Sequence, residues 1–128
     1  MDMILDEDSV VVADAVWMTA EDSERHREAT RRAGRADPDR TRILVPPTLV
    51  IESVTPEHER HDVVIKRRMY AKFGVPNYWI LDVYQKTLEC LTLVKDVYAL
   101  DQIGRGKGKV APKCFAGLTI ELSKVWDD

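Results

Sequence analysis

Cysteine is scarce in this sequence, and its two cysteines lie far apart. Cys90 and Cys114 belong to no Cys-x-x-Cys or Cys/His cluster, so we do not expect a zinc site. Two thiols are typical of a reducing, cytoplasmic setting, and one disulfide between them is the alternative. A chain of 128 residues buries enough surface to form a core without such cross-links. We therefore expect a single domain over residues 1–128.

Long apolar runs, a basic N-terminus and an excess of positive charge are also missing. No stretch approaches the ~18 apolar residues that cross a bilayer, and the first eight residues are acidic where a secretory signal is basic. We therefore expect a cytoplasmic protein without a membrane partner. The net charge of −3 argues against a protein that coats nucleic acid by bulk electrostatics. It does not exclude an enzyme that gathers carboxylates around a metal ion.

The apolar runs that are present predict a mixed sheet with one well-defined helix. The expected strands, which are rich in β-branched or apolar residues, are 9–13, 48–54, 78–83 and a hairpin of 88–94 with 97–100. Between the second and third strands, we expect a helix that is capped by Asp62, runs to about Phe73 and ends at Gly74. The positions of Tyr78, Trp79 and Trp126 favour core packing, and stacking on nucleic-acid bases is the alternative. Farther on, we expect a flexible basic loop at 104–109 and a last strand within 115–126.

The segment 21–42 differs from the rest of the chain. It is rich in Arg, Glu and Asp and nearly free of large apolar residues. We interpret it as a charged, solvated insertion that is partly helical. A charged surface is the favoured interpretation of its arginines, and contact with DNA is the alternative.

Two acidic residues that lie at or in apolar strands are the candidate catalytic groups. Asp8 precedes the strand at 9–13, and Glu52 interrupts the strand at 48–54. Neighbouring carboxylates repel each other unless a cation neutralises them, and Mg²⁺ prefers such oxygen ligands. Lys66, in the following helix, could stabilise the charge that builds up on a phosphate oxygen during hydrolysis. A purely structural salt bridge between Glu52 and Lys66 is the competing interpretation.

A series of fixed spacings within residues 48–83, TLVIESVTPEHERHDVVIKRRMYAKFGVPNYWILDV, favours the catalytic interpretation. The segment combines a buried strand with Glu-x-x-Thr-Pro, then Asp, Lys and Tyr, and then Gly-Val-Pro-x-Tyr-Trp before an apolar strand that ends in Asp. Similar elements are the strand after Asp8 and the Gly-Leu-Thr-Ile stretch at 117–120. Together they closely resemble the Uma-two family of putative restriction endonucleases, which belongs to the PD-(D/E)xK nuclease-like proteins.

This resemblance implies a restriction-endonuclease-like α/β (α+β) fold, with a mixed sheet flanked by helices. It implies Asp8, Glu52 and Lys66 as catalytic residues, with Asp8 and Glu52 as ligands of Mg²⁺ or Mn²⁺. Val54 stands where the family usually has a strand-borne Lys, so Lys66 is the expected substitute, and Glu7 replaces the usual Pro before Asp8. Only seven residues precede Asp8, so we expect the chain to lack the family's usual N-terminal segment.

The function expected from the resemblance is magnesium-dependent hydrolysis of DNA phosphodiester bonds. The alternative is a catalytically inactive nucleic-acid-binding or protein-interaction module that retains the nuclease fold. We expect a homodimer, because two sites related by a twofold axis match the symmetry of a DNA duplex.

Overall fold

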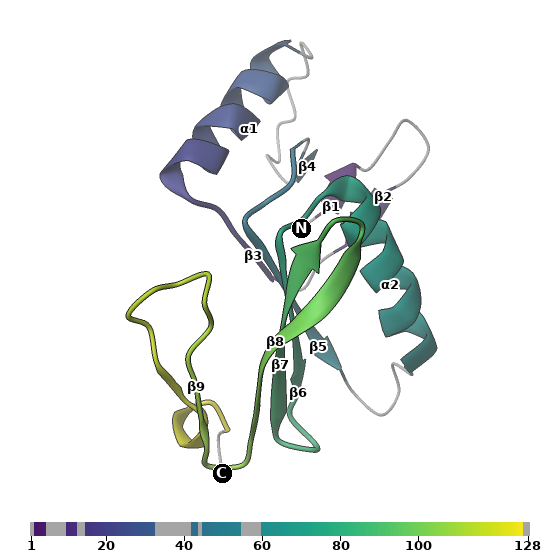
Figure 1. Cartoon of the computed structure of the whole chain (residues 1–128). Coiled ribbons are helices and arrows are strands. Elements are labelled where there is room, and N and C mark those ends of the chain that lie inside the picture. Colours follow the sequence, from purple (N-terminus) through teal and green to yellow (C-terminus); the bar gives the residue numbers. More distant parts are fainter. Residues whose placement is uncertain are drawn as a thin grey trace.

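A five-stranded mixed sheet forms the centre of the molecule (Figure 1). The computed structural model describes residues 2–4, 10–12, 15–32, 42–43, 45–54 and 60–126. In spatial order, the strands of the central sheet are β3 (Ala15–Trp17), β5 (Leu49–Val54), β6 (Asn77–Asp82), β7 (Thr87–Val94) and β8 (Val97–Arg105). β5 and β6 are parallel, and the other neighbouring pairs are antiparallel. The predicted mixed sheet and the hairpin that turns at Lys95-Asp96 are therefore confirmed.

Helix α2 (Arg60–Phe73) connects the parallel strands β5 and β6. Gly74 ends the helix as predicted, with a φ of +89° that a residue with a side chain rarely adopts. The backbone N–H groups of Gly74 and Val75 donate to the carbonyls of Ala71 and Tyr70 at 3.1 Å each, which is the hydrogen-bond pattern of a Schellman motif. The predicted start is wrong, because Asp62 lies inside a helix that begins at Arg60. Acidic residues are favoured throughout the first turn, so Asp62 alone does not identify the cap.

The two faces of the central sheet bury different apolar clusters. On the face covered by α2, Val50, Tyr70 and Tyr78 belong to one cluster. On the other face, Trp79 and Trp126 belong to the second cluster. Side chains alternate between the faces of a strand, so neighbouring residues of β6 supply both clusters. The prediction that the aromatic residues of these strands pack in the core is confirmed.

The C-terminal part of the described chain covers the second face with short elements, which are β9 (Lys109–Val110), β10 (Ile120–Glu121) and the 3₁₀ helix η1 (Leu122–Lys124). The expected flexible loop at 104–109 is instead partly strand, since Gly104 belongs to β8 and β9 begins at residue 109. Gly104 lies so close to Val110 and Leu122 that a Cβ atom would sit 2.6 Å from Leu122 Cδ1. Close packing therefore orders this glycine-rich segment. The predicted last strand is confirmed but has only two residues.

Short elements also occupy the N-terminal part. A small sheet has the strand order β2-β1-β4, with β1 (Asp2–Ile4), β2 (Val10–Val12) and β4 (Arg42–Ile43). The predicted strand at 9–13 corresponds to β2. Strands β1, β3 and β4 were not predicted, because a segment of two or three residues is too short to show the alternation of apolar and polar residues that identifies a strand.

Helix α1 (Ala20–Arg32) forms the first half of the charged segment 21–42. It projects away from the central sheet in Figure 1. Ion pairs between residues three apart run along it, in Arg25–Asp22, Arg27–Glu24 and Arg31–Glu28. These pairs fit the charged-surface interpretation of its arginines.

The start of α1 is attached to the start of β5 by Thr19, Asp22 and Thr48. The Thr19 hydroxyl accepts the backbone N–H of Asp22 at 3.1 Å, and the Thr48 hydroxyl accepts the backbone N–H of Thr19 at 3.0 Å. The Thr48 hydroxyl also donates to the Asp22 carboxylate, and this hydrogen bond is the main reason why the pKa of Asp22 is lowered. The network caps the helix and fixes its first turn to the central sheet.

Candidate active site

Glu52 is a buried carboxylate on the face of the central sheet that α2 covers. Its exposed fraction is 3%, and it pairs across the parallel ladder with Ile80 of the core. Burying an ionised carboxylate costs several kcal/mol unless charges and hydrogen bonds compensate it. The partners of Glu52 therefore determine what this position can do.

Two residues of α2 provide such partners. Lys66 Nζ lies 3.5 Å from Glu52 Oε2, and the hydroxyl of Tyr70 donates a hydrogen bond to Glu52 Oε1. Lys66 and Tyr70 are four residues apart, so they lie on the same face of the helix. Helix α2 thus supplies a cation to one carboxylate oxygen and a neutral donor to the other.

The three side chains differ in their access to solvent. Tyr70 is fully buried, and the Glu52 side chain is 4% exposed, whereas the Lys66 side chain is 26% exposed. The cluster therefore extends from the core to the edge of the helix, where a polar ligand could approach the ammonium group. The predicted proximity of Glu52 and Lys66 is confirmed by this geometry.

The metal-binding part of the prediction lies largely outside the described residues, because Asp8 is among the residues that the structure does not describe. Within the described ranges, no group of three or more His, Cys, Asp or Glu residues could hold a metal ion. Glu52 supplies the hard oxygen donor that Mg²⁺ prefers. The donor chemistry of Glu52 therefore fits Mg²⁺, and Asp8 remains the predicted second carboxylate.

Tyr70 is the contact that sequence reasoning did not assign to the site. It stood out only as one position of the family motif, and a tyrosine in an amphipathic helix is usually a core residue. Its ring does pack in the core, at a centroid distance of 5.2 Å from that of Tyr78. The four-residue spacing from Lys66 was the available signal that its hydroxyl also faces Glu52.

Other polar candidates have structural surroundings. Asp82 ends β6 and accepts the backbone N–H of Gln85 at 2.9 Å, so it stabilises the turn that follows. His26 lies on α1, and burial lowers its pKa. Cys90 and Cys114 are free thiols, and burial raises the pKa of Cys90 to about 12. These residues add no group to the Glu52 cluster in the described part of the chain.

A solved structure shares the fold that carries this cluster. It is described as the crystal structure of a putative nuclease belonging to DUF820 from Anabaena variabilis ATCC 29413, with 17% sequence identity and a TM-score of 0.53. The match covers 66% of the present chain and 46% of that chain, so less than half of the matched protein is represented. The likeness shows that the two proteins share the predicted mixed α+β fold, with a mixed sheet and helices.

The family of the chain is given by its sequence. The chain belongs to the Uma2 family, described as putative restriction endonuclease, which matches residues 1–123. A comparison with curated proteins gives no match. No helix among the described residues is long and apolar enough to cross a membrane.

Proposed function

We propose that the chain is a magnesium-dependent endonuclease that hydrolyses DNA phosphodiester bonds. The observation that carries the proposal is the cluster of Glu52, Lys66 and Tyr70 in a chain of the Uma2 family. The cluster places the buried carboxylate of Glu52, a group that can bind a metal ion, beside the partly exposed ammonium group of Lys66. In such a site the carboxylate would hold the metal ion, and the cation would stabilise the charge on the phosphate.

The role proposed for Lys66 follows from the charge changes of the reaction. Hydrolysis joins a water oxygen to phosphorus and breaks the bond between phosphorus and the leaving sugar oxygen, so negative charge builds up on the phosphate oxygens. An ammonium group fixed beside the phosphate stabilises that charge more strongly than bulk water does. The ion pair with Glu52 limits the positions that the Lys66 side chain can occupy.

Glu52 and Asp8 are the proposed ligands of Mg²⁺, and Tyr70 is a positioning residue for Glu52. When bound, Mg²⁺ supplies Lewis acidity to the phosphoryl group. The hydrogen bond from Tyr70 restricts rotation of the Glu52 carboxylate, so Glu52 Oε2 stays on the side of Lys66. Partners of this kind commonly determine the orientation of metal ligands.

The decisive experiment replaces Lys66 by Met and measures nicking of supercoiled plasmid with magnesium and with manganese. Lys66→Met is expected to keep the fold and the magnesium affinity while cleavage falls by a factor on the order of 10² or more, as is typical when one transition-state contact is lost. Lys124→Met is the matched control, because Lys124 is an exposed lysine of η1 that pairs with Glu121 at the end of β10.

Three outcomes would contradict parts of this proposal. Unchanged nicking by Lys66→Met removes Lys66 from the mechanism. Nicking that survives in both Asp8→Ala and Glu52→Gln indicates a contaminating nuclease. If calorimetry detects no magnesium binding and the wild type does not cleave any DNA, the alternative of a non-catalytic module replaces the enzyme.

A homodimer is part of the proposal. Two copies related by a twofold axis would present their sites to the two strands of a duplex with equivalent geometry. Sedimentation velocity at increasing protein concentration tests this directly, and a monodisperse monomer at the highest concentration would exclude it.

A further inference from the structure

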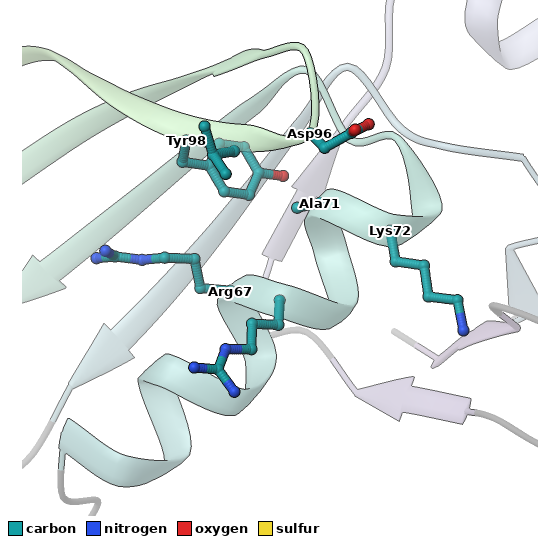
Figure 2. A pocket seen from close by; sticks show the side chains of 7 residues that line it. Arg67, Ala71, Lys72, Asp96 and Tyr98 are labelled. Carbon is teal, nitrogen blue, oxygen red and sulfur yellow. The ribbon is translucent and has the colours of Figure 1, made fainter.

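An open cleft of about 560 Å³ lies between α2 and the tip of the β7–β8 hairpin (Figure 2). Helix α2 contributes Arg67, Arg68 and Lys72 to its lining, and the hairpin contributes Asp96 and Tyr98. The lining thus contains three cationic side chains and one anionic one. This surplus of positive charge makes the cleft suitable for an anion.

The charge of α2 contrasts with that of the whole chain. Its sequence, RHDVVIKRRMYAKF, has five Lys or Arg residues and one Asp, whereas the chain has a net charge of −3. The helix is therefore a local concentration of positive charge on an acidic protein. Such a concentration attracts polyanions locally even when the net charge does not.

Arg67 provides a second, independent observation. Its Nε atom is buried and has no hydrogen-bond partner among the described residues. A buried N–H donor without an acceptor costs about 1–3 kcal/mol, and such groups are rare in folded proteins. A phosphate oxygen is an acceptor that matches the planar guanidinium group, and it would satisfy Nε if the Arg67 side chain turned into the cleft that it lines.

The cleft and the Glu52 cluster lie on opposite flanks of α2, because Glu52 belongs to β5 and Tyr98 to β8, with β6 and β7 between them. Tyr98 lines the cleft and packs against Tyr78 at a centroid distance of 5.5 Å, and Tyr78 in turn packs against Tyr70. Tyr70 donates to Glu52. A wall of three aromatic rings thus separates the cleft from the buried carboxylate and holds both in a fixed relation.

We propose that this cleft binds backbone phosphates of the nucleic-acid substrate, away from the phosphate that is cleaved. The inference rests on the proposed function, because it takes Glu52 and Lys66 as the place of cleavage. The contact is independent of base sequence, since it involves only phosphate oxygens. It would hold the substrate in position without touching the reacting atoms.

The test measures the affinity of the full-length protein for a short fluorescein-labelled DNA duplex by anisotropy, in EDTA so that no cleavage occurs. The double variant Arg68→Gln/Lys72→Gln removes two exposed cleft cations. Each phosphate contact contributes about 0.9 to the slope of log affinity against log salt. The double variant should therefore lower the slope by about two and weaken binding roughly eightfold per contact at about 0.1 M salt.

The control is the double variant Lys113→Gln/Lys124→Gln, which removes the same charge from two exposed lysines outside the cleft. It should leave the salt slope nearly unchanged. Arg67→Gln is a separate variant whose fold is checked by circular dichroism, because its partly buried side chain could also contribute to stability. The proposal would be overturned if the cleft and control variants lowered the slope of log affinity against log salt equally. It would also be overturned if neither variant lowered that slope.

Two further measurements separate this inference from the proposed function. Cleft variants should raise KM for cleavage and leave kcat nearly unchanged, because the cleft does not touch the reacting atoms. A fall in kcat alone would contradict the assignment.

If Lys66→Met abolishes cleavage while the cleft variants bind DNA as the wild type does, only the inference fails. If inorganic phosphate binds the cleft more tightly than the duplex does, the ligand is a small anion and the inference is wrong.

Discussion

The hydrogen bond from Tyr70 to Glu52 can be removed with little change in shape. Tyr70→Phe deletes one oxygen atom and retains the ring that packs against Tyr78. Because both Tyr70 and Glu52 are buried, water cannot readily replace the lost donor. The substitution therefore isolates the interaction that fixes one carboxylate oxygen.

The expected loss follows from the charge of the acceptor. Hydrogen bonds to charged groups stabilise proteins by roughly 1.5–3 kcal/mol, compared with about 1 kcal/mol for neutral pairs. We expect Tyr70→Phe to reduce the free energy of unfolding by about 2 kcal/mol. For a domain of this size, that corresponds to a fall in Tm of about 8 °C, at roughly 4 °C per kcal/mol.

A double-mutant cycle with Glu52→Gln assigns the effect to this pair. In the Glu52→Gln background the acceptor is neutral, so Tyr70→Phe should cost only about 1 kcal/mol. The expected coupling energy of about 1 kcal/mol exceeds the usual deviation from additivity of about 0.5 kcal/mol. The measurement is urea unfolding followed by circular dichroism, with the slope m compared among the four proteins.

Tyr84→Phe is the control, because Tyr84 is 69% exposed in the turn after β6. Its hydroxyl loss should change stability by less than about 0.5 kcal/mol. Equal losses from Tyr70→Phe and Tyr84→Phe would show that the hydrogen bond to Glu52 does not hold the carboxylate in place. A Tyr70→Phe effect that is unchanged in the Glu52→Gln background would lead to the same conclusion.

Three further predictions concern positions away from Glu52. Gly104→Ala should destabilise the protein by about 1–3 kcal/mol in urea unfolding, because its Cβ atom would overlap Leu122. Asp22→Asn should remove a stabilisation that is fully present above about pH 5 and is lost as the pH falls below 3.8, since the folded state lowers the pKa of Asp22. At mildly alkaline pH, a thiol reagent should label exposed Cys114 in the folded protein and Cys90 only after unfolding, because burial raises the pKa of Cys90 to about 12.

Each of these predictions has its own control. Ala99→Ser changes an exposed position of the same strand as Gly104 and should alter stability by less than about 0.5 kcal/mol. For Asp22, a stability difference between wild type and Asp22→Asn that persists at low pH would contradict the assignment of the pKa shift. For the thiols, loss of the fast-reacting group in Cys114→Ser is expected, and fast labelling of Cys90 in that variant would show that the core opens.

The sequence was sufficient to predict the elements that bury long apolar runs. Leu49 to Val54 and Tyr78 to Asp82 are nearly continuous in apolar residues, which identifies strands that are covered on both faces. The pairing of Glu52 with Lys66 was predictable because a helix that follows a strand returns along it. The start of α2 was less certain, since acidic residues occur throughout a first turn.

Other features depended on contacts between distant segments. The hydroxyl of Tyr70 could not be assigned because a tyrosine on the apolar side of a helix serves equally well as a core residue. The cleft beside Arg67 exists only because the β7–β8 hairpin lies next to α2. The local sequence of neither element predicts that they pack together. The order in 104–109 arises from packing of Gly104 against Val110 and Leu122, whereas local glycine content indicated a flexible loop.

The strand–helix–strand connection has a consequence for how the candidate site forms during folding. Lys66 and Tyr70 are only 14 and 18 residues from Glu52 in the chain, so closing the connection costs little loop entropy. These contacts can therefore form before the more distant strand pairs of the sheet. An insertion or deletion within the charged segment 21–42 lies outside this connection and leaves its length unchanged. The Glu52 cluster is thus carried by one contiguous stretch of chain, whereas the proposed second ligand, Asp8, lies outside that stretch.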